Sequence, residues 1–130
     1  ATDIPAFDTM NNPEAKQLKM DNEIRAIEKI RDLMGGKTGQ SFYDLWFEFE
    51  HKATYEAKVA NALDKLEAQI QHNEADIETW LPIEFEMLFM LDKHTDFEPV
   101  LTAFKNLIVE EGICKLENAG IEVKQVKPTT

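Results

Sequence analysis

Hydrophobic residues recur every three or four positions along most of the chain, which is the spacing of one face of an α-helix. The first such run has apolar side chains at positions 20, 24, 27, 30 and 34. Asn12, Pro13 and Glu14 are typical of a helix start, because Asn caps unpaired amides, Pro fits the first turn and an acid suits the positive end of the helix dipole. A Gly-Gly pair at 35–36 provides a left-handed stop. We therefore predict a helix over about residues 13–34.

The same reasoning predicts four more helices. Residues 39–52 place aromatic side chains and a leucine on one face, and Thr54 is an N-cap for a helix that reaches about residue 73. Thr79 is expected to cap the next helix, with Pro82 in its first turn. A further helix is predicted to start at residues 96–99 and to end at Gly120. Its apolar stripe comprises Phe97, Leu101, Phe104 and Ile108.

Residues 121–130 begin with a strand-like alternation, but so short a segment has little sheet to pair with. We interpret it as an ordered tail at most. Because the sequence has no long linker and no internal repeat, it predicts a single all-α domain over residues 1–130, built of about five helices.

The predicted helix after Thr54 carries two stripes. The expected core face consists of Val59, Leu63, Leu66 and Ile70, and a second line on another flank consists of Ala57, Ala60, Asp64 and Ala68. Because alanines let a neighbouring helix approach closely, we expect this helix to be covered on two sides and Asp64 to be partly buried. A buried carboxylate needs a partner, which could be Lys65, Arg25, water at an exposed edge or a metal cation. The pattern leaves these alternatives open.

Composition limits the classes of partner. The chain has 25 acidic and 14 basic residues, so its net charge of −11 repels the backbone of a nucleic-acid polymer. A small phosphorylated substrate is still possible, since a bound cation reverses the local potential of an acidic pocket. No apolar run approaches the roughly 18 residues needed to span a bilayer, so no membrane partner is expected. The single cysteine, Cys114, indicates a reducing, cytoplasmic setting.

The positions of the histidines do not indicate a metal site. Glu48 and His51 form one E-x-x-H pattern, but a di-iron helical bundle needs two. His72 lies eight residues after Asp64, about 12 Å along a helix, so the two side chains cannot bind one ion.

Two stretches together resemble a known family. The segments TDIPAFD (residues 2–8) and EAKVANALDKLEAQIQ (residues 56–71), the second coming after DLWFEFE, resemble the later part of HD-domain metal-dependent phosphohydrolases, particularly the helical branch that contains 5′-deoxynucleotidases. The resemblance covers about residues 1–73 and implies an HD-domain-like helical bundle, truncated at its N-terminus. The family's first histidine and its His-Asp pair would lie upstream of Ala1. Thr2 departs from the glycine usual at that position of the turn.

By position, Asp64 matches the family's last metal-binding aspartate, and Asp3 matches the acid that positions substrate or the attacking water. The resemblance implies a divalent metal ion (Mn, Co, Mg, Zn or Fe), hydrolysis of nucleoside 5′-monophosphates or similar small phosphomonoesters, and a homodimer. Because a single carboxylate cannot hold a divalent ion, we expect this fragment to be inactive alone. The alternative is a non-catalytic acidic helical module that dimerises or docks a partner through its aromatic helix.

Overall fold

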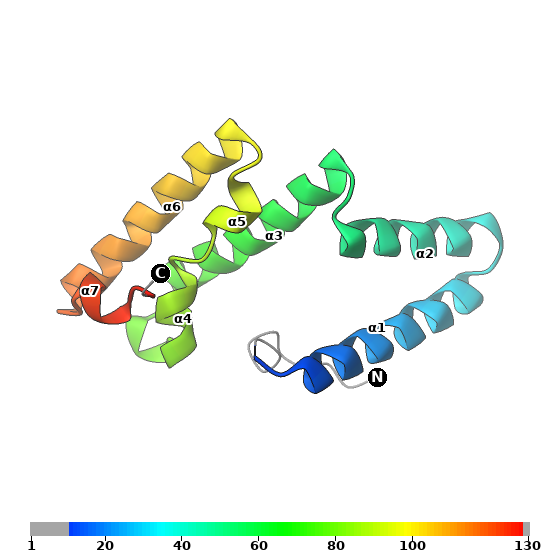
Figure 1. Cartoon of the computed structure of the whole chain (residues 1–130), viewed down its shortest axis with the longest axis horizontal. Coiled ribbons are helices and arrows are strands. Elements are labelled where there is room, and N and C mark those ends of the chain that lie inside the picture. The colour runs from blue at the N-terminus through cyan, green and yellow to red at the C-terminus, as the bar shows by residue number, and fades with distance from the viewer. Residues whose placement is uncertain (1–10, 129–130) are drawn as a thin grey trace. The chain divides into compact units, whose positions relative to one another are not determined.

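The computed structural model describes residues 11–128, and every regular element among them is a helix (Figure 1). Seven α-helices and one short 3₁₀ helix follow each other along this part of the chain, which confirms the all-α prediction. Contacts divide the chain into two compact units, residues 1–53 and 54–130. The prediction of one domain over residues 1–130 stays a prediction.

The first unit contains a hairpin of two helices, α1 (Pro13–Met34) and α2 (Gly36–His51). As predicted, the Asn12 side chain accepts a hydrogen bond from the amide of Ala15, at 3.1 Å, and Gly35 ends α1 with a φ of 68°. A left-handed φ is strained for residues with a side chain, so glycine suits this stop.

The two helices of the hairpin meet where Gly39 lies against the end of α1. A Cβ at Gly39 would overlap the carbonyl oxygen of Arg31, so only glycine fits there. The guanidinium of Arg31 lies 4.5 Å from the centre of the Tyr43 ring, a cation–π contact between the helices. The predicted apolar stripe of α1 is buried at Ile27 but exposed at Met34.

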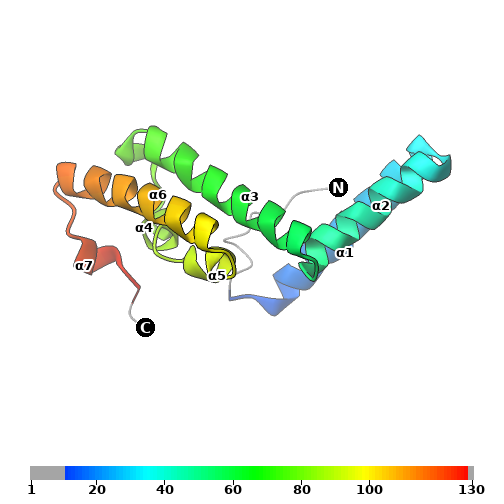
Figure 2. The same ribbon diagram turned by 90° about the horizontal axis from the view of Figure 1, so that it is seen from above.

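The second unit is built around α3 (Tyr55–Glu74) and α6 (Pro99–Asn118), which lie side by side (Figures 1 and 2). As predicted, Thr54 caps α3 by accepting a hydrogen bond from the Ala57 amide at 3.1 Å. A 3₁₀ helix (Ile77–Thr79), α4 (Pro82–Met87) and α5 (Asp92–Thr95) connect them. The core has two clusters, one of Ala62, Leu66, Leu91, Leu101 and Ile108, the other of Trp80, Leu88 and Leu116.

Two local predictions in this unit differ from the structure. Thr79 does not cap a helix, because its hydroxyl donates to the carbonyl of Asp76 and so closes the 3₁₀ turn. Helix α4 begins instead at Pro82, where the Glu84 carboxylate accepts a hydrogen bond from the Leu81 amide at 2.8 Å. The N-cap therefore lies two residues later than predicted, at Leu81 in place of Thr79.

The segment after Gly120 contains a short helix, α7 (Val123–Val126), and not a strand. Its apolar residues pack against the cluster around Trp80, through Ile121, Val123 and Val126. The apolar residues of this segment thus face a helical core, at spacings of two and three residues and not in the strict alternation of a strand.

Candidate metal centre

Asp64 lies in the middle of α3, on the side away from the core. Its side chain is 59% exposed, so the expected partial burial is wrong. The buried residues of α3 are Ala57, Asn61, Ala62, Leu66, Gln69 and Asn73. At 100° per residue, Asp64 points about 200° from Leu66, which places the carboxylate almost opposite the core. Ala60 and Ala68 are exposed with it, so most of the small-residue line is uncovered.

The carboxylate of Asp64 forms an ion pair with the neighbouring side chain. Its Oδ2 lies 3.4 Å from the Nζ of Lys65, and both side chains are substantially exposed. Arg25, the other basic partner considered, forms hydrogen bonds within its own helix. Its guanidinium donates to Asn22 Oδ1 and to the carbonyl of Asp21. An exposed pair of this kind contributes little to stability, so Lys65 is a weak competitor for any other cation.

The histidines of the described chain contact other groups. The Nε2 of His72 lies 3.5 Å from Glu84 Oε1, and the Nδ1 of His94 lies 3.1 Å from the side-chain amide of Asn61. Within residues 11–128 no cluster of three or more His, Cys, Asp or Glu side chains is suited to hold a metal ion. Asp3 lies outside the described residues. The described residues therefore do not fit a complete metal centre, since one carboxylate is too few ligands.

Three buried amide side chains on α3 were missed by sequence reasoning. Asn73 donates from Nδ2 to the carbonyl of Ile108, at 3.0 Å, and to Glu111 Oε2, at 3.3 Å. Gln69 donates to Asn73 Oδ1 at 2.9 Å, and Asn61 contacts His94. These bonds fix α3 against α5 and α6, and so fix the helix that carries Asp64. The available signal was a repeat of amides at 61, 69 and 73, which a count of apolar residues overlooks.

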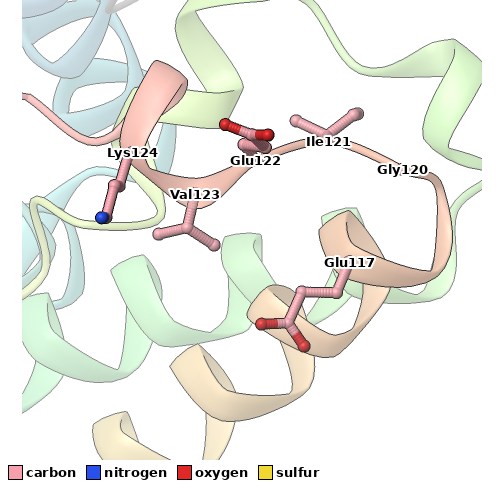
Figure 3. Close-up of a pocket in the computed structure, with 6 residues that line it drawn as sticks. All are labelled: Glu117, Gly120, Ile121, Glu122, Val123 and Lys124. Carbon is pink, nitrogen blue, oxygen red and sulfur yellow. The ribbon is translucent and has the colours of Figure 1, made fainter.

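An open hollow of about 600 Å³ lies between the end of α6 and α7 (Figure 3). It is lined by Glu117, Gly120, Ile121, Glu122, Val123 and Lys124. The two carboxylates and the ammonium group belong to exposed residues, and Asp64 is not among the lining residues. The hollow is therefore separate from the candidate metal ligand and has no buried polar group to bind a ligand.

Comparison with known proteins places the chain in a family. The family described as HD domain matches residues 1–104, a range that includes both Asp3 and Asp64. The chain therefore belongs to the HD domain family, and the resemblance is confirmed.

A more specific similarity is to the 5′-deoxynucleotidase HDDC2 of Xenopus laevis. The two sequences are 39% identical over 57 residues, which are 44% of this chain and 28% of that protein. The chain thus spans little more than a quarter of the length of this curated relative. No solved structure matches the chain significantly. In the described part of the chain, no helix is both long enough and apolar enough to cross a membrane.

Proposed function

We propose that this chain is part of an HD-superfamily phosphohydrolase that acts on nucleoside 5′-monophosphates or similar small phosphomonoesters. The observation that carries the proposal is the HD domain match over residues 1–104. The similarity to a relative named 5′-deoxynucleotidase supports the substrate class. The net charge of −11 favours a small phosphate substrate over a polymer.

In this proposal Asp64 supplies one carboxylate ligand to a divalent metal ion. The carboxylate is accessible, and its pairing with Lys65 is weak enough for a metal ion to displace. The buried amides on the other side of α3 hold its backbone in place, which a ligand helix requires. The remaining ligands would come from outside residues 11–128, and Asp3 would contact the substrate or the attacking water. The 130-residue chain alone should then release no phosphate.

The test is the Asp64→Asn variant of the full-length protein. We expect loss of bound divalent metal and at least a roughly tenfold loss of phosphate release from deoxynucleoside monophosphates. Because Asp64 is exposed and weakly paired, the free energy of unfolding of the metal-free protein should change by less than about 0.5 kcal/mol. Metal content is measured by elemental analysis and stability by urea unfolding.

Glu67→Gln is the matched control, because Glu67 is an exposed carboxylate on the same helix, one turn away. It should keep both metal and turnover. If Asp64→Asn retained its metal and its activity, Asp64 would not be a ligand.

The second candidate function is the non-catalytic docking module. The observation that favours it is the exposure of two large apolar side chains, Phe42 and Leu45, on the aromatic helix α2. A full-length protein that binds no divalent metal and hydrolyses no phosphomonoester would support this function over the enzyme.

A further inference from the structure

The first unit buries very little of its own apolar surface. Among residues 11–53 only Ile27 and Gly39 are buried. Helices in proteins gain most of their stability by packing an amphipathic face, so a hairpin with two buried residues lacks most of a core. Several of its large apolar side chains are exposed instead: Leu18, Ile30, Leu33, Met34, Phe42 and Leu45.

Four of these side chains lie on one side of the hairpin, which we name the hairpin face: Ile30 and Leu33 on α1, Phe42 and Leu45 on α2. On each helix they come three and six residues after the buried residue, which is Ile27 on α1 and Gly39 on α2. At 100° per residue, equal intervals turn the side chains by equal angles. Because the two helices of the hairpin run in opposite directions, these equal angles point to the same side of it.

The hairpin face is large enough to bind a helix. In chain order its four side chains are 39%, 87%, 44% and 63% exposed. At about 150–200 Å² for each side chain, these fractions leave roughly 350–450 Å² of apolar surface exposed. Patches of this size on soluble proteins are often functional. The surface of two neighbouring helices fits a third, amphipathic helix, which places apolar side chains three and four residues apart against it.

An open hollow of about 430 Å³ lies on α1 beside the hairpin face. It is lined by Asn22, Arg25, Ala26, Lys29 and Ile30. The first four are separated by three, four and seven residues, so their side chains surround a hole of the kind that receives one side chain of a packed helix. The short side chain of Ala26 leaves the space at its centre.

The charge around this hollow is opposite to that of the chain. The chain has 25 acidic and 14 basic residues, but the lining of the hollow has two cations and no carboxylate. Arg25 and Lys29 are exposed, and neither forms a salt bridge within residues 11–128. Two hydrogen bonds within α1 hold the Arg25 guanidinium, which leaves its other N–H groups for a partner.

The carboxylates of α1 do not cancel this positive rim. Glu23 is paired with Lys19, at 3.1 Å. The other acidic residues of the helix lie on the side away from the hairpin face: Glu14, Asp21, Glu28 and Asp32. An apolar surface beside a positive rim favours a partner with apolar side chains flanked by negative charge.

We propose that the hairpin face is a docking surface for an acidic amphipathic helix of another protein. One apolar side chain of that helix enters the hole at Ala26, others cover the hairpin face, and carboxylates beside them pair with Arg25 and Lys29. This inference gives the docking surface of the second candidate function a partner chemistry. It holds equally for an enzyme, so a failure to release phosphate would leave it standing.

The first measurement uses two labelled amphipathic peptides of about 20 residues as probes. They share their leucines and differ only in the flanking residues, which are glutamate in one and lysine in the other. Fluorescence anisotropy with the 130-residue chain should show that the glutamate peptide binds at least about fivefold more tightly. The net charge of −11 acts in the opposite direction. Tighter binding of the lysine peptide would therefore indicate non-specific attraction and contradict the proposal.

Variants of the hairpin face locate the binding. Leu33→Glu and Leu45→Glu should each weaken binding of the glutamate peptide at least about tenfold, because each places a negative charge against the peptide's leucines. Both side chains are mostly exposed, so the helical circular dichroism and the melting curve should not change. Leu107→Glu is the matched control, since Leu107 is an exposed leucine on α6, and it should bind the peptide as the parent chain does.

A charge exchange tests the positive rim. The double variant Arg25→Glu with Lys29→Glu should reverse the preference, so that the lysine peptide binds more tightly. The control with the same net charge is Lys58→Glu with Lys93→Glu, which changes two exposed lysines of the second unit and should keep the preference for glutamate. A preference for glutamate that survives the first double variant would show that the rim does not bind the partner.

Two further results would identify a different occupant and overturn the proposal. The full-length protein should bind the glutamate peptide as tightly as the 130-residue chain, and binding by the chain alone would mean that another part of the same protein covers the hairpin face. Light scattering should give the same mass for the parent chain and for Leu33→Glu. A mass that falls in the variant would mean that a second copy covers the face.

Discussion

At the scale of single residues, Gly112 shows how closely the second unit is packed. A Cβ at this position would lie 2.6 Å from Leu88 Cδ1 and 3.1 Å from Asn73 Oδ1. Leu88 is fully buried, so its side chain has no free space to move into. The absence of a side chain at Gly112 therefore lets the Leu88 and Asn73 side chains lie directly against α6.

We predict that Gly112→Ala destabilises the protein. Overpacking costs about 1–3 kcal/mol, and the better helix propensity of alanine offsets up to about 1 kcal/mol of it. Urea unfolding followed by circular dichroism should show a net loss of about 1–2 kcal/mol. Asn106→Ala is the control on the exposed side of α6 and should be neutral or slightly stabilising. A gain in stability at Gly112 equal to that of the control would show that the close contact does not exist.

The environment of a candidate site residue was not predictable from the sequence. The resemblance selected Asp64 as a metal ligand, which stays a prediction, and the ion pair with Lys65, one of the partners considered, is present. The exposure of Asp64 was not predictable, because a line of alanines allows a close neighbour but does not specify one. The buried amides were missed for the converse reason: Asn73 is polar in type but satisfies its hydrogen bonds inside the core.

At the scale of elements, the long helices were predicted best because their limits are set by local chemistry. Asn12 and Thr54 cap as expected, and Gly35 and Gly120 have the positive φ of helix stops. The short helices α4, α5 and α7 were missed or predicted at the wrong position in the sequence. Four to six residues form fewer than two helical turns, which is too short to show a clear hydrophobic period. Which face of a helix is buried depends on its neighbours, so Leu63 was wrongly expected in the core.

We predict that the Thr54 cap contributes measurably to α3. Thr54→Ala removes the acceptor of the Ala57 amide and should cost about 1 kcal/mol in the free energy of unfolding. Thr54→Ser keeps the hydroxyl and should restore most of that loss. Thr38→Ala, on the exposed surface of α2, is the neutral comparison. Equal stabilities for the alanine and serine variants would rule out the hydroxyl as the source of the effect.

At the scale of the whole molecule, the net negative charge lowers the stability of the folded state, and this effect belongs to no single contact. A net charge of −11 on 130 residues repels itself in the compact state. The described ion pairs include an exposed one, Lys65–Asp64, and a partly buried one, His72–Glu84, and a few such pairs compensate little of this repulsion. Screening by salt should therefore stabilise the fold.

We predict that raising NaCl from low to physiological concentration increases the melting temperature by about 2–5 °C. The measurement is calorimetric and is made at constant protein concentration, because association also shifts the melting temperature. A variant with three exposed carboxylates neutralised, at Glu67, Glu74 and Glu110, should respond less to salt. An unchanged or falling melting temperature would mean that attractive pairs outweigh the net charge.

The chain has two tryptophans, and each unit contains one of them. Trp80 is buried, its indole nitrogen donates to the carbonyl of His72 at 2.8 Å, and Phe85 lies beside its ring. Trp46 lies on α2 against Phe47. Each unit thus has its own fluorescent reporter. With Trp46 replaced by phenylalanine, the remaining emission follows the second unit alone, so the unfolding of the two units can be observed separately without an added dye.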